Sequence, residues 1–192
     1  MSLIIFVAAG LLIIFLLIFV FNRFVGNRNL VKDAWSNIDV MLKKRHDLIP
    51  NLVNTVKGYA AHESGTLERV IEARNRAASV SDGDINGRIA AENQLQQALR
   101  SIFALGEAYP DLKADASFLD LQARLTQVET ELERSRRYYN ATTRENNTFG
   151  ESLPGVLFAG LLGYQHFDFF EADDGERAVP EVDFAGKSGG SV

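Results

Sequence analysis

The first 21 residues are almost entirely apolar, and apolar residues recur at helical spacing soon afterwards. Leu3 to Phe21 is a run of 19 residues without a charge or a strongly hydrogen-bonding side chain. A helix needs about 20 such residues to cross the roughly 30 Å hydrocarbon core of a bilayer. The pattern therefore predicts an N-terminal transmembrane anchor over residues 1–24, with residues 3–21 in contact with lipid.

A cleavable signal peptide is the alternative interpretation of this apolar run. It would need a basic start, a shorter apolar stretch and small residues at the cleavage site. Here the run ends at Phe21 and is followed by Asn22, Arg23 and Phe24. We therefore favour an anchor that is retained in the mature protein.

The stretch from Ala34 to Glu63 lies in a regular amphipathic pattern, and we expect the rest of the chain to pack against it. Apolar residues alternate at intervals of four and three, and Arg45 fills the single polar position of the series. Such a seam is typical of a helix that faces another helix. The apolar positions are Val31, Trp35, Ile38, Leu42, Ile49, Leu52, Val56 and Tyr59.

Pro50 lies inside this series. A proline removes one backbone donor and disfavours helical geometry at the preceding residue, so a kink near Ile49 is expected. Alternatively, Asp47 caps a new helix that has Pro50 in its first turn. Because the apolar phase is unchanged across Pro50, we predict one bent helix. A second bend is expected between His62 and Gly65, after which helical spacing resumes.

Two further helical stretches follow a polar break at residues 79–87. The first begins near Arg88 and is stopped by a proline, and the second begins at Asp115, a candidate helix cap. The second keeps its three- and four-residue spacing as far as Phe149. Three long amphipathic helices joined by short turns predict an all-α fold, with an antiparallel bundle of long, partly kinked helices over residues 28–150.

The chain beyond this bundle has a different composition. Residues 151–171 are apolar and rich in aromatic side chains, which predicts either a short helix that closes the bundle or an exposed surface that meets another subunit or the bilayer. Residues 172–192 predict an acidic, flexible end, within which residues 179–184 alternate as an edge strand would. The candidate contact residues are Phe158, Tyr164, Phe167, Phe169 and Phe170.

Composition excludes several classes of function. The formal net charge of −5 and a pI near 5.3 argue against a general nucleic-acid-binding protein, which would carry a dense basic face. The chain has no cysteine, so disulfides, thiolate metal sites and thiol nucleophiles are all excluded. The absence of cysteine does not determine the cellular compartment.

Basic residues cluster on the C-terminal flank of the anchor, at Arg23, Arg28 and Lys32. The positive-inside rule then predicts a single-pass protein of the inner, cytoplasmic membrane, with its N-terminus outside and its bundle in the cytoplasm. Lys43, Lys44 and Arg45 could form a basic ledge for anionic lipid or an acidic partner. If the helix stands upright, however, Lys43 lies roughly 30 Å beyond the bilayer. The alternative for Arg45 is a buried pairing that sets the register of the bundle.

The sequence contains no recognisable catalytic or metal-binding motif. His62 and Glu63 begin like a helical zinc-protease motif, but Thr66 stands where the second histidine is needed. The Glu-x-x-His pairs of di-iron bundles and a glycine-rich phosphate loop are also missing from the sequence. We therefore expect a protein that is not an enzyme and that carries no metal or cofactor.

Five sequence blocks stand out: AWSNIDVMLKKRHDLIPNLVNTVKGYAAHE, TLERVIEAR, EAYPDLKA, SFLDLQARL and RRYYN. Over roughly residues 28–171 they resemble the signature blocks of the LemA family of bacterial membrane-anchored helical proteins. The resemblance implies one N-terminal span and a bundle of long helices, and it does not imply an enzyme. The chain departs from the family at Asn146, where a tyrosine is usual, and at Gly150, where a proline is usual. The signature residues are Trp35, Asp39, Arg45, Asp47, Pro50, Tyr59, Glu63, Tyr109, Pro110, Tyr139 and Asn140.

These patterns favour a non-enzymatic, membrane-anchored helical scaffold that self-assembles into a homo-oligomer. Its copies would bury apolar helix faces and the aromatic tail against one another, with their anchors aligned in one membrane. The alternative is a regulatory or adaptor subunit of a membrane protease, a transporter or an envelope-stress system. A third interpretation, an enzyme with an unrecognised site, requires a concave pocket with converging charged groups.

Overall fold

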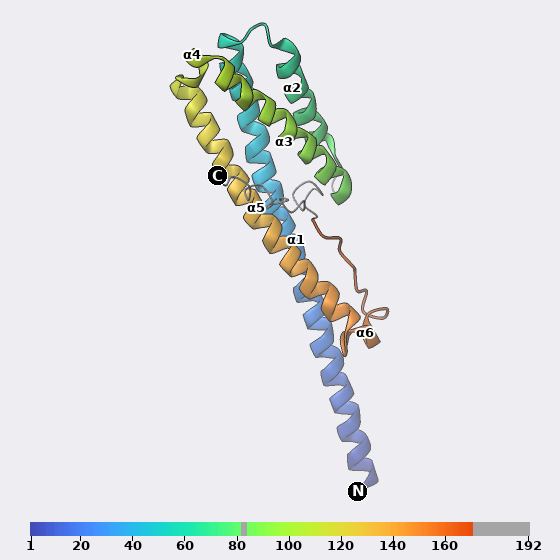
Figure 1. Cartoon of the computed structure of the whole chain (residues 1–192). Helices are drawn as coiled ribbons and strands as arrows, with labels where there is room; N and C mark the ends of the chain where they lie inside the picture. The colour runs from blue at the N-terminus through green and yellow to red at the C-terminus, as the bar shows by residue number, and fades with distance from the viewer. Residues whose placement is uncertain (82–83, 171–192) are drawn as a thin grey trace, which may run out of the picture.

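The computed structural model describes residues 1–81 and 84–170, which form six α-helices and no strand (Figure 1). The all-α fold predicted from the spacing is therefore confirmed. The acidic end predicted for residues 172–192, with its candidate strand at 179–184, lies outside the described residues. The helices are α1 (Ser2–Tyr59), α2 (Ser64–Ser79), α3 (Ile85–Ala108), α4 (Pro110–Lys113), α5 (Ala116–Glu151) and α6 (Gly155–Phe158).

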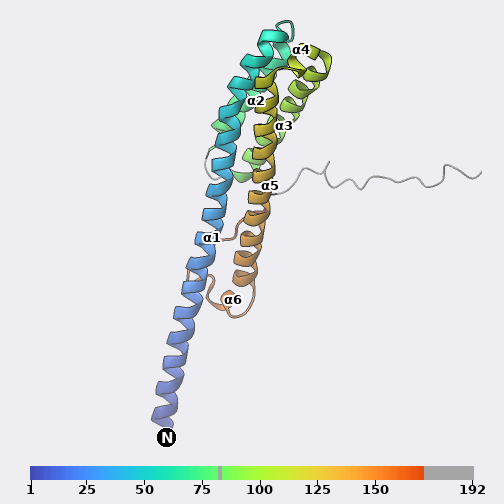
Figure 2. The ribbon, with the colours of Figure 1, turned by 90° about the vertical axis from the view of Figure 1, so that its left-hand side faces the viewer.

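Four long helices run alternately in opposite directions along a rod-shaped bundle (Figures 1 and 2). α1 ascends from the N-terminus to the far end of the rod, called the tip below. α2 returns from the tip, α3 ascends again, and α5 descends beside α1. The short α4 turns the chain at the tip, and α6 lies at the opposite end of α5. The first part of α1 therefore extends beyond the bundle without other helices around it.

That first part of α1 is long and apolar enough to cross a membrane, as the sequence predicts. No other part of the described chain covers most of its large side chains, such as Leu3, Phe6 and Phe15. A lipid-facing surface requires such exposure. Exposed apolar surface costs about 25 cal/mol per Å² in water, and that cost is removed in hydrocarbon. The N-terminal helix is thus suited to lipid and unsuited to water.

α1 continues through Pro50 without a break, so one helix forms here and not two. A proline at this position leaves the carbonyl of His46, four residues earlier, without its helical donor. The structure supplies a replacement, because Nε of Arg74 on α2 donates to the His46 carbonyl oxygen over 3.4 Å. The neighbouring helix therefore compensates for the hydrogen bond that the proline removes.

The expected second bend between His62 and Gly65 is instead a reversal of the chain. α1 ends at Tyr59, and α2 begins at Ser64 and runs back along the bundle. The bundle therefore has four long helices, and the prediction of three was wrong. Gly58 and Gly65 flank the break, where their low helix propensity makes it easier to interrupt the helix.

The core has two parts that follow one another along the rod. All four long helices form the part near the tip, and its most buried side chains include Leu52, Val70, Ile102 and Phe118. Nearer the end at which α1 leaves the bundle, α1 and α5 pack together with residues of the tail. The buried residues of this second part are Val31, Ala34, Ile38, Leu42, Leu132, Tyr139 and Phe170.

Asp115 caps α5, as the sequence predicts, and also links the two helices that meet at the tip. Its Oδ1 accepts a hydrogen bond from the backbone N–H of Phe118 at 2.8 Å. Its Oδ2 accepts one from the hydroxyl of Tyr59, the last residue of α1, at 2.9 Å. The end of α1 and the start of α5 are thereby joined through one carboxylate.

This arrangement predicts a stability that depends on pH. The hydrogen bond from the backbone of Phe118, and then that from Tyr59, hold the pKa of Asp115 below its ordinary value. A lowered pKa in the folded state stabilises the fold above the pKa of the unfolded state, and this stabilisation is lost as pH falls through the folded value. We expect Asp115→Asn to lower the melting temperature most at neutral pH, with the difference shrinking below about pH 4.

Circular dichroism of the full-length protein in detergent measures this difference. Asp33→Asn, at an exposed position on α1, is the matched control and should show no such pH-dependent difference. A constant difference between Asp115→Asn and wild type across the pH range would contradict a role for the charged carboxylate.

Candidate functional site

Arg45 lies inside the bundle, with only 2% of its side chain exposed. Its Nη1 is 3.5 Å from Oε2 of Glu92 on α3 and 3.3 Å from Oε2 of Glu129 on α5. Both contacts are ion pairs without hydrogen-bond geometry at Nη1. One cation on the α1 seam thus joins three helices, which is the buried pairing expected as the alternative to a basic ledge.

Glu92 completes this Arg45 cluster, which comprises Arg45, His46, Glu92 and Glu129. The Glu92 side chain is fully buried, and its Oε1 lies 2.8 Å from Nε2 of His46. Glu92 is not among the predicted site residues, although its position in the sequence carries a signal. Glu92 lies three residues before Leu95, so it fills a polar position on the apolar seam of α3. Arg45 fills such a position on the seam of α1.

A polar groove of about 410 Å³ runs beside this cluster between α1 and the α2–α3 hairpin. Lys43 and Asp47 line its wall, and Asp39 pairs there with Arg88. Small-molecule sites are mostly apolar, with a few converging polar groups. This groove is instead lined mainly by charged side chains, of which Asp39 pairs with Arg88 and Glu92 pairs with His46.

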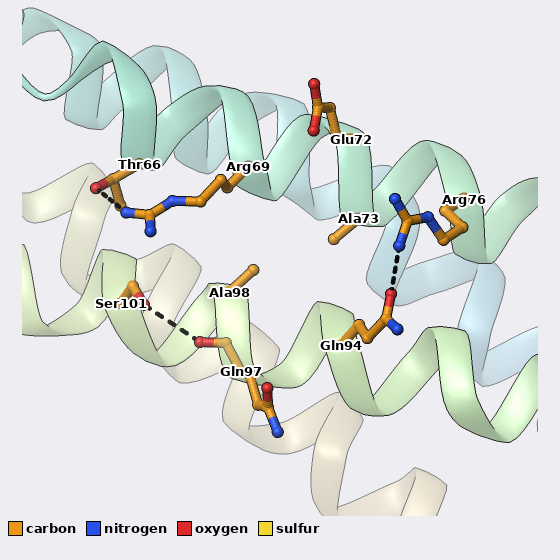
Figure 3. Close-up of a pocket in the computed structure, with 9 residues that line it drawn as sticks. All are labelled: Thr66, Arg69, Glu72, Ala73, Arg76, Gln94, Gln97, Ala98 and Ser101. Carbon is orange, nitrogen blue, oxygen red and sulfur yellow. Dashed lines mark hydrogen bonds between the residues drawn. The ribbon is translucent and has the colours of Figure 1, made fainter.

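A second groove, of about 350 Å³, lies between α2 and α3 (Figure 3). Ala73 and Ala98 point toward each other between the two helices, and longer polar side chains surround them. Arg76 donates from Nη1 to Oε1 of Gln94 at 2.7 Å, and Arg69 donates from Nη2 to the hydroxyl of Thr66 at 3.0 Å. The groove offers a polar surface, without a nucleophile that is paired with a base.

The two lysines of the expected basic ledge are exposed on α1, and neither joins the Arg45 cluster. At about 1.5 Å per residue, Lys43 lies about 33 Å along the continuous α1 from Phe21. If the helix stands upright in a membrane, this distance from Lys43 to the end of the apolar run is several Debye lengths at physiological salt. The structure therefore favours a role for Lys43 within the polar groove over lipid binding.

The tail after α6 is held against α5 by asparagine side chains. Asn147 Nδ2 donates to the carbonyl of Phe167 at 2.8 Å, and its Oδ1 accepts from the N–H of the same residue at 3.2 Å. Asn140 binds both backbone groups of Phe170 in the same way, each at 2.8 Å. Asn146 donates to the carbonyl of Gln165 at 2.9 Å. These amides satisfy backbone groups that have no partner in a helix or a sheet, and we call Asn140, Asn146 and Asn147 the asparagine clamp.

Phe170, the last residue of the tail that the structure describes, enters the core, which corrects one prediction. Phe170 is only 4% exposed and lies 6.3 Å from Trp35, ring centroid to ring centroid. The guanidinium carbon of Arg136 lies 4.5 Å from the centre of the Phe170 ring. Phe170 is therefore not an interaction surface, because its own chain covers it. Phe158, Tyr164 and Phe167 are half-buried, whereas Phe169 is exposed.

Tyr139 connects the tail to α1. Its ring packs edge-on against Trp35 at 5.3 Å, and its hydroxyl donates to the carbonyl of Asp168 at 2.9 Å. Burial raises the pKa of Tyr139 above its ordinary value, so the phenol stays protonated and able to donate. Trp35 also lies beneath the guanidinium of Arg88, at 5.6 Å from the ring centre.

Both departures from the family pattern lie in the last turns of α5 and contact the tail. Asn146 belongs to the asparagine clamp, where a tyrosine could not make the same donation. A Cβ atom at Gly150 would lie 2.2 Å from Cε2 of Tyr164, so a larger residue would displace that ring. The two residues are therefore adapted to the path that this chain takes out of α5.

The remaining signature residues lie at or near the tip. The hydroxyl of Tyr109, at the end of α3, donates to Oε1 of Glu63 at 3.2 Å. Pro110 occupies the first turn of α4, where its missing donor costs little. Together with the contact between Tyr59 and Asp115, these residues fix the loops that reverse the chain. Among residues 1–81 and 84–170, no three histidine, aspartate or glutamate side chains gather as metal ligands.

Comparison with known proteins agrees with the resemblance seen in the sequence blocks. A sequence model described as the LemA family matches residues 34–184, which is most of the chain. The chain belongs to the LemA family. The match begins slightly later than the resemblance at residues 28–171 and extends further into the tail. The signature residues of this LemA-family chain lie in the core, at the tip and around the tail.

Three curated relatives are similar over most of this chain. Protein LemA of Metamycoplasma hominis is 24% identical over 156 residues, covering 81% of this chain and 71% of that protein. Magnetosome protein MamQ 2 of Paramagnetospirillum magneticum is 22% identical, covering 79% of this chain and 64% of that protein. Magnetosome protein MamQ of Magnetospirillum gryphiswaldense is 21% identical, covering 84% and 70%. None of these three is named for an enzymatic activity.

The burial of the Arg45 cluster predicts a strong loss of stability when its cation is removed. Arg45→Ala leaves the carboxylate of Glu92 buried without its cation, which costs about 3–5 kcal/mol. Arg124→Ala, which breaks an exposed pair with Asp120, should cost about 0.5 kcal/mol or less. Thermal and denaturant unfolding of the full-length protein in detergent compares the two variants. Similar losses for both would contradict a structural role for the buried cation.

Because the asparagine clamp holds the tail, we expect that a substitution in the clamp loosens the tail separately from the bundle. Asn147→Ala removes both hydrogen bonds to the backbone of Phe167, and each such bond contributes about 1 kcal/mol. We expect hydrogen exchange at residues 164–170 to accelerate by about tenfold or more. Mass spectrometry of the full-length protein measures this exchange, and Thr148→Ala, at the exposed neighbouring position, is the control. Unchanged exchange in Asn147→Ala would show that other contacts hold the tail.

Proposed function

We propose that this chain is a non-enzymatic, membrane-anchored helical scaffold whose copies assemble into a homo-oligomer at the cytoplasmic membrane. One observation carries the proposal: α1 is a single helix from the apolar run to the tip. The bundle is therefore joined to its anchor without a flexible linker. Such a construction suits a protein that presents a surface at a fixed height above the bilayer.

The polar groups of the bundle support a scaffold over an enzyme. In the described residues, the buried charges of the Arg45 cluster pair with one another, and ion pairs or hydrogen bonds join several of the polar side chains that line the two grooves. Candidate catalytic groups usually lie in a cleft with strongly shifted pKa values and a nearby partner that activates them. The signature residues instead stabilise the core, the tip and the tail.

Contact between copies is expected at the anchors, and not through the aromatic tail. The apolar seams of the bundle are used within the chain, and Phe170 is covered by Trp35 and Tyr139. Large apolar residues exposed on the bundle, such as Val40 and Leu119, stand singly. Anchors held in one membrane are also concentrated relative to one another, which favours weak association between spans.

The basic flank of the span supports a cytoplasmic bundle. Arg23 and Arg28 follow the apolar run directly, and Lys32 lies one turn further along α1. Such residues are retained on the cytoplasmic side during membrane insertion. The MamQ relatives, which are named magnetosome proteins, support association with a membrane but not a particular side of it.

A regulatory or adaptor subunit of a membrane protease, a transporter or an envelope-stress system is the second candidate. The second groove, between α2 and α3, favours the adaptor, because its lining is polar and polar surfaces are typical of transient complexes. An adaptor would be a monomer in mild detergent and would co-purify with a membrane-protein partner. A scaffold would have a mass above that of the monomer by light scattering.

Because the chain has no cysteine, single substitutions introduce one reactive thiol each. We expect cysteines placed in turn at residues 8–18 to form cross-linked dimers on oxidation in native membranes, recurring every three to four residues along the span. Val40→Cys, on the exposed surface of the bundle, is the control and should form none. Absence of dimers at every scanned position, together with a monomeric mass in detergent, would exclude self-assembly and favour the adaptor.

A further inference from the structure

The segment around α6 carries an apolar surface that the chain does not cover. No charged residue or histidine occurs from Ser152 to Gln165. Most of the large apolar side chains in this segment are exposed, in contrast to the single exposed residues of the bundle. We call four of them the α6 surface: Leu153, Val156, Leu157 and Leu161, with exposed fractions of 73%, 47%, 69% and 79%.

The helix α6, which carries Val156 and Leu157, lies where the apolar run of α1 meets the bundle (Figures 1 and 2). Phe24, three residues after that run, contacts the rings of Phe149 and Tyr164 at centroid distances of 5.0 and 5.7 Å. Val20 is fully buried, so neighbouring chain covers one side of the last turn of the run. The segment that carries the α6 surface is therefore level with the end of the span.

Close packing holds this segment in place. A Cβ atom at Gly155 would lie 2.0 Å from the carbonyl oxygen of Phe149 and 3.5 Å from Cζ of Phe24. Only a glycine allows α6 to approach the end of α5 so closely. One side of the segment thus contacts α1 and α5, and the exposed leucines are presented by a fixed backbone.

We propose that the α6 surface is a second membrane contact, inserted into the headgroup and upper acyl region of the same bilayer that α1 crosses. The proposal rests on the membrane anchoring given under the proposed function. An uncharged segment with exposed leucines beside a span is continuous with a lipid-facing surface. Arg23, Arg28 and Tyr164 lie at this level, and such residues are typical of the membrane–water boundary.

Lipid fits this surface better than a second copy of the chain does. A standard protein interface involves roughly 20–30 residues on each side, and the α6 surface offers four exposed side chains. A bilayer needs no matching shape, and one already surrounds the neighbouring span under the proposed function. With the α6 surface in lipid, the membrane contacts the protein at two places, which sets the rotation of α1 about its own axis.

Single cysteines carrying an environment-sensitive fluorophore test this proposal in the full-length protein. Leu157→Cys reports on the α6 surface, and Ile13→Cys reports on the middle of the apolar run. Leu119→Cys is the matched control, because it is an exposed leucine near the start of α5 at the tip. Each labelled protein is placed in phosphatidylcholine and phosphatidylglycerol vesicles. The vesicles contain lipids with a nitroxide quencher either near the headgroup or near the end of the acyl chain.

We expect the Leu157→Cys label to emit at shorter wavelength than the Leu119→Cys label and to be quenched most by the nitroxide near the headgroup. This depth corresponds to insertion by about 5–10 Å. The Ile13→Cys label should be quenched most by the deeper nitroxide.

Quenching of Ile13→Cys without quenching of Leu157→Cys would overturn the second contact alone. Absence of quenching at both would overturn the anchoring as well. A shift to shorter wavelength at Leu157→Cys without quenching would show that protein, not lipid, covers the α6 surface.

Discussion

Burial of the α1 seam against α5 is the contact around which the other elements are placed. The two helices keep one antiparallel register from the end of α5 to the tip, since every step along α1 is matched by an equal step back along α5. The α2–α3 hairpin then adds to the half near the tip, and the tail adds to the other half. The pairs that show this register are Phe24 with Phe149, Trp35 with Tyr139, Arg45 with Glu129, and Tyr59 with Asp115.

A purely apolar seam would specify this register weakly, because a slip by one turn places one aliphatic side chain where another was. Buried charges limit that freedom. A slip of four residues toward the start of α5 would place Arg45 opposite Leu125 and leave a buried cation without its partner on α5, whereas a slip of four residues the other way would place it opposite Glu133. Replacing such a cluster by packed aliphatic residues is often neutral or stabilising, so its value here lies in specificity. The Arg45 cluster therefore disfavours a slip toward the start of α5 that hydrophobic burial alone would allow.

Helical spacing was sufficient to predict helical segments and the cap at Asp115, because each depends on a local pattern, and the polar position of Arg45 on an apolar seam indicated a buried pairing without identifying Glu92 as its partner. Helical spacing could not predict the reversal after Tyr59, since the apolar phase resumes in α2 as though the helix had only bent. The tail was harder still, because side-chain amides such as Asn147 bind its backbone and leave no periodic signal in the sequence. Aromatic residues look alike in a sequence whether they pack within the chain or against a partner, as Phe170 shows.

The uninterrupted α1 has a mechanical consequence. At about 1.5 Å per residue, the part from Phe21 to Tyr59 is about 57 Å long. Once residues 3–21 are in a bilayer, each degree of tilt of a rigid helix of this length moves its far end sideways by about 1 Å. Bilayers of different thickness impose different tilts on a span of fixed length. In a membrane, a change in the local thickness of the lipid would therefore move the tip of the bundle sideways.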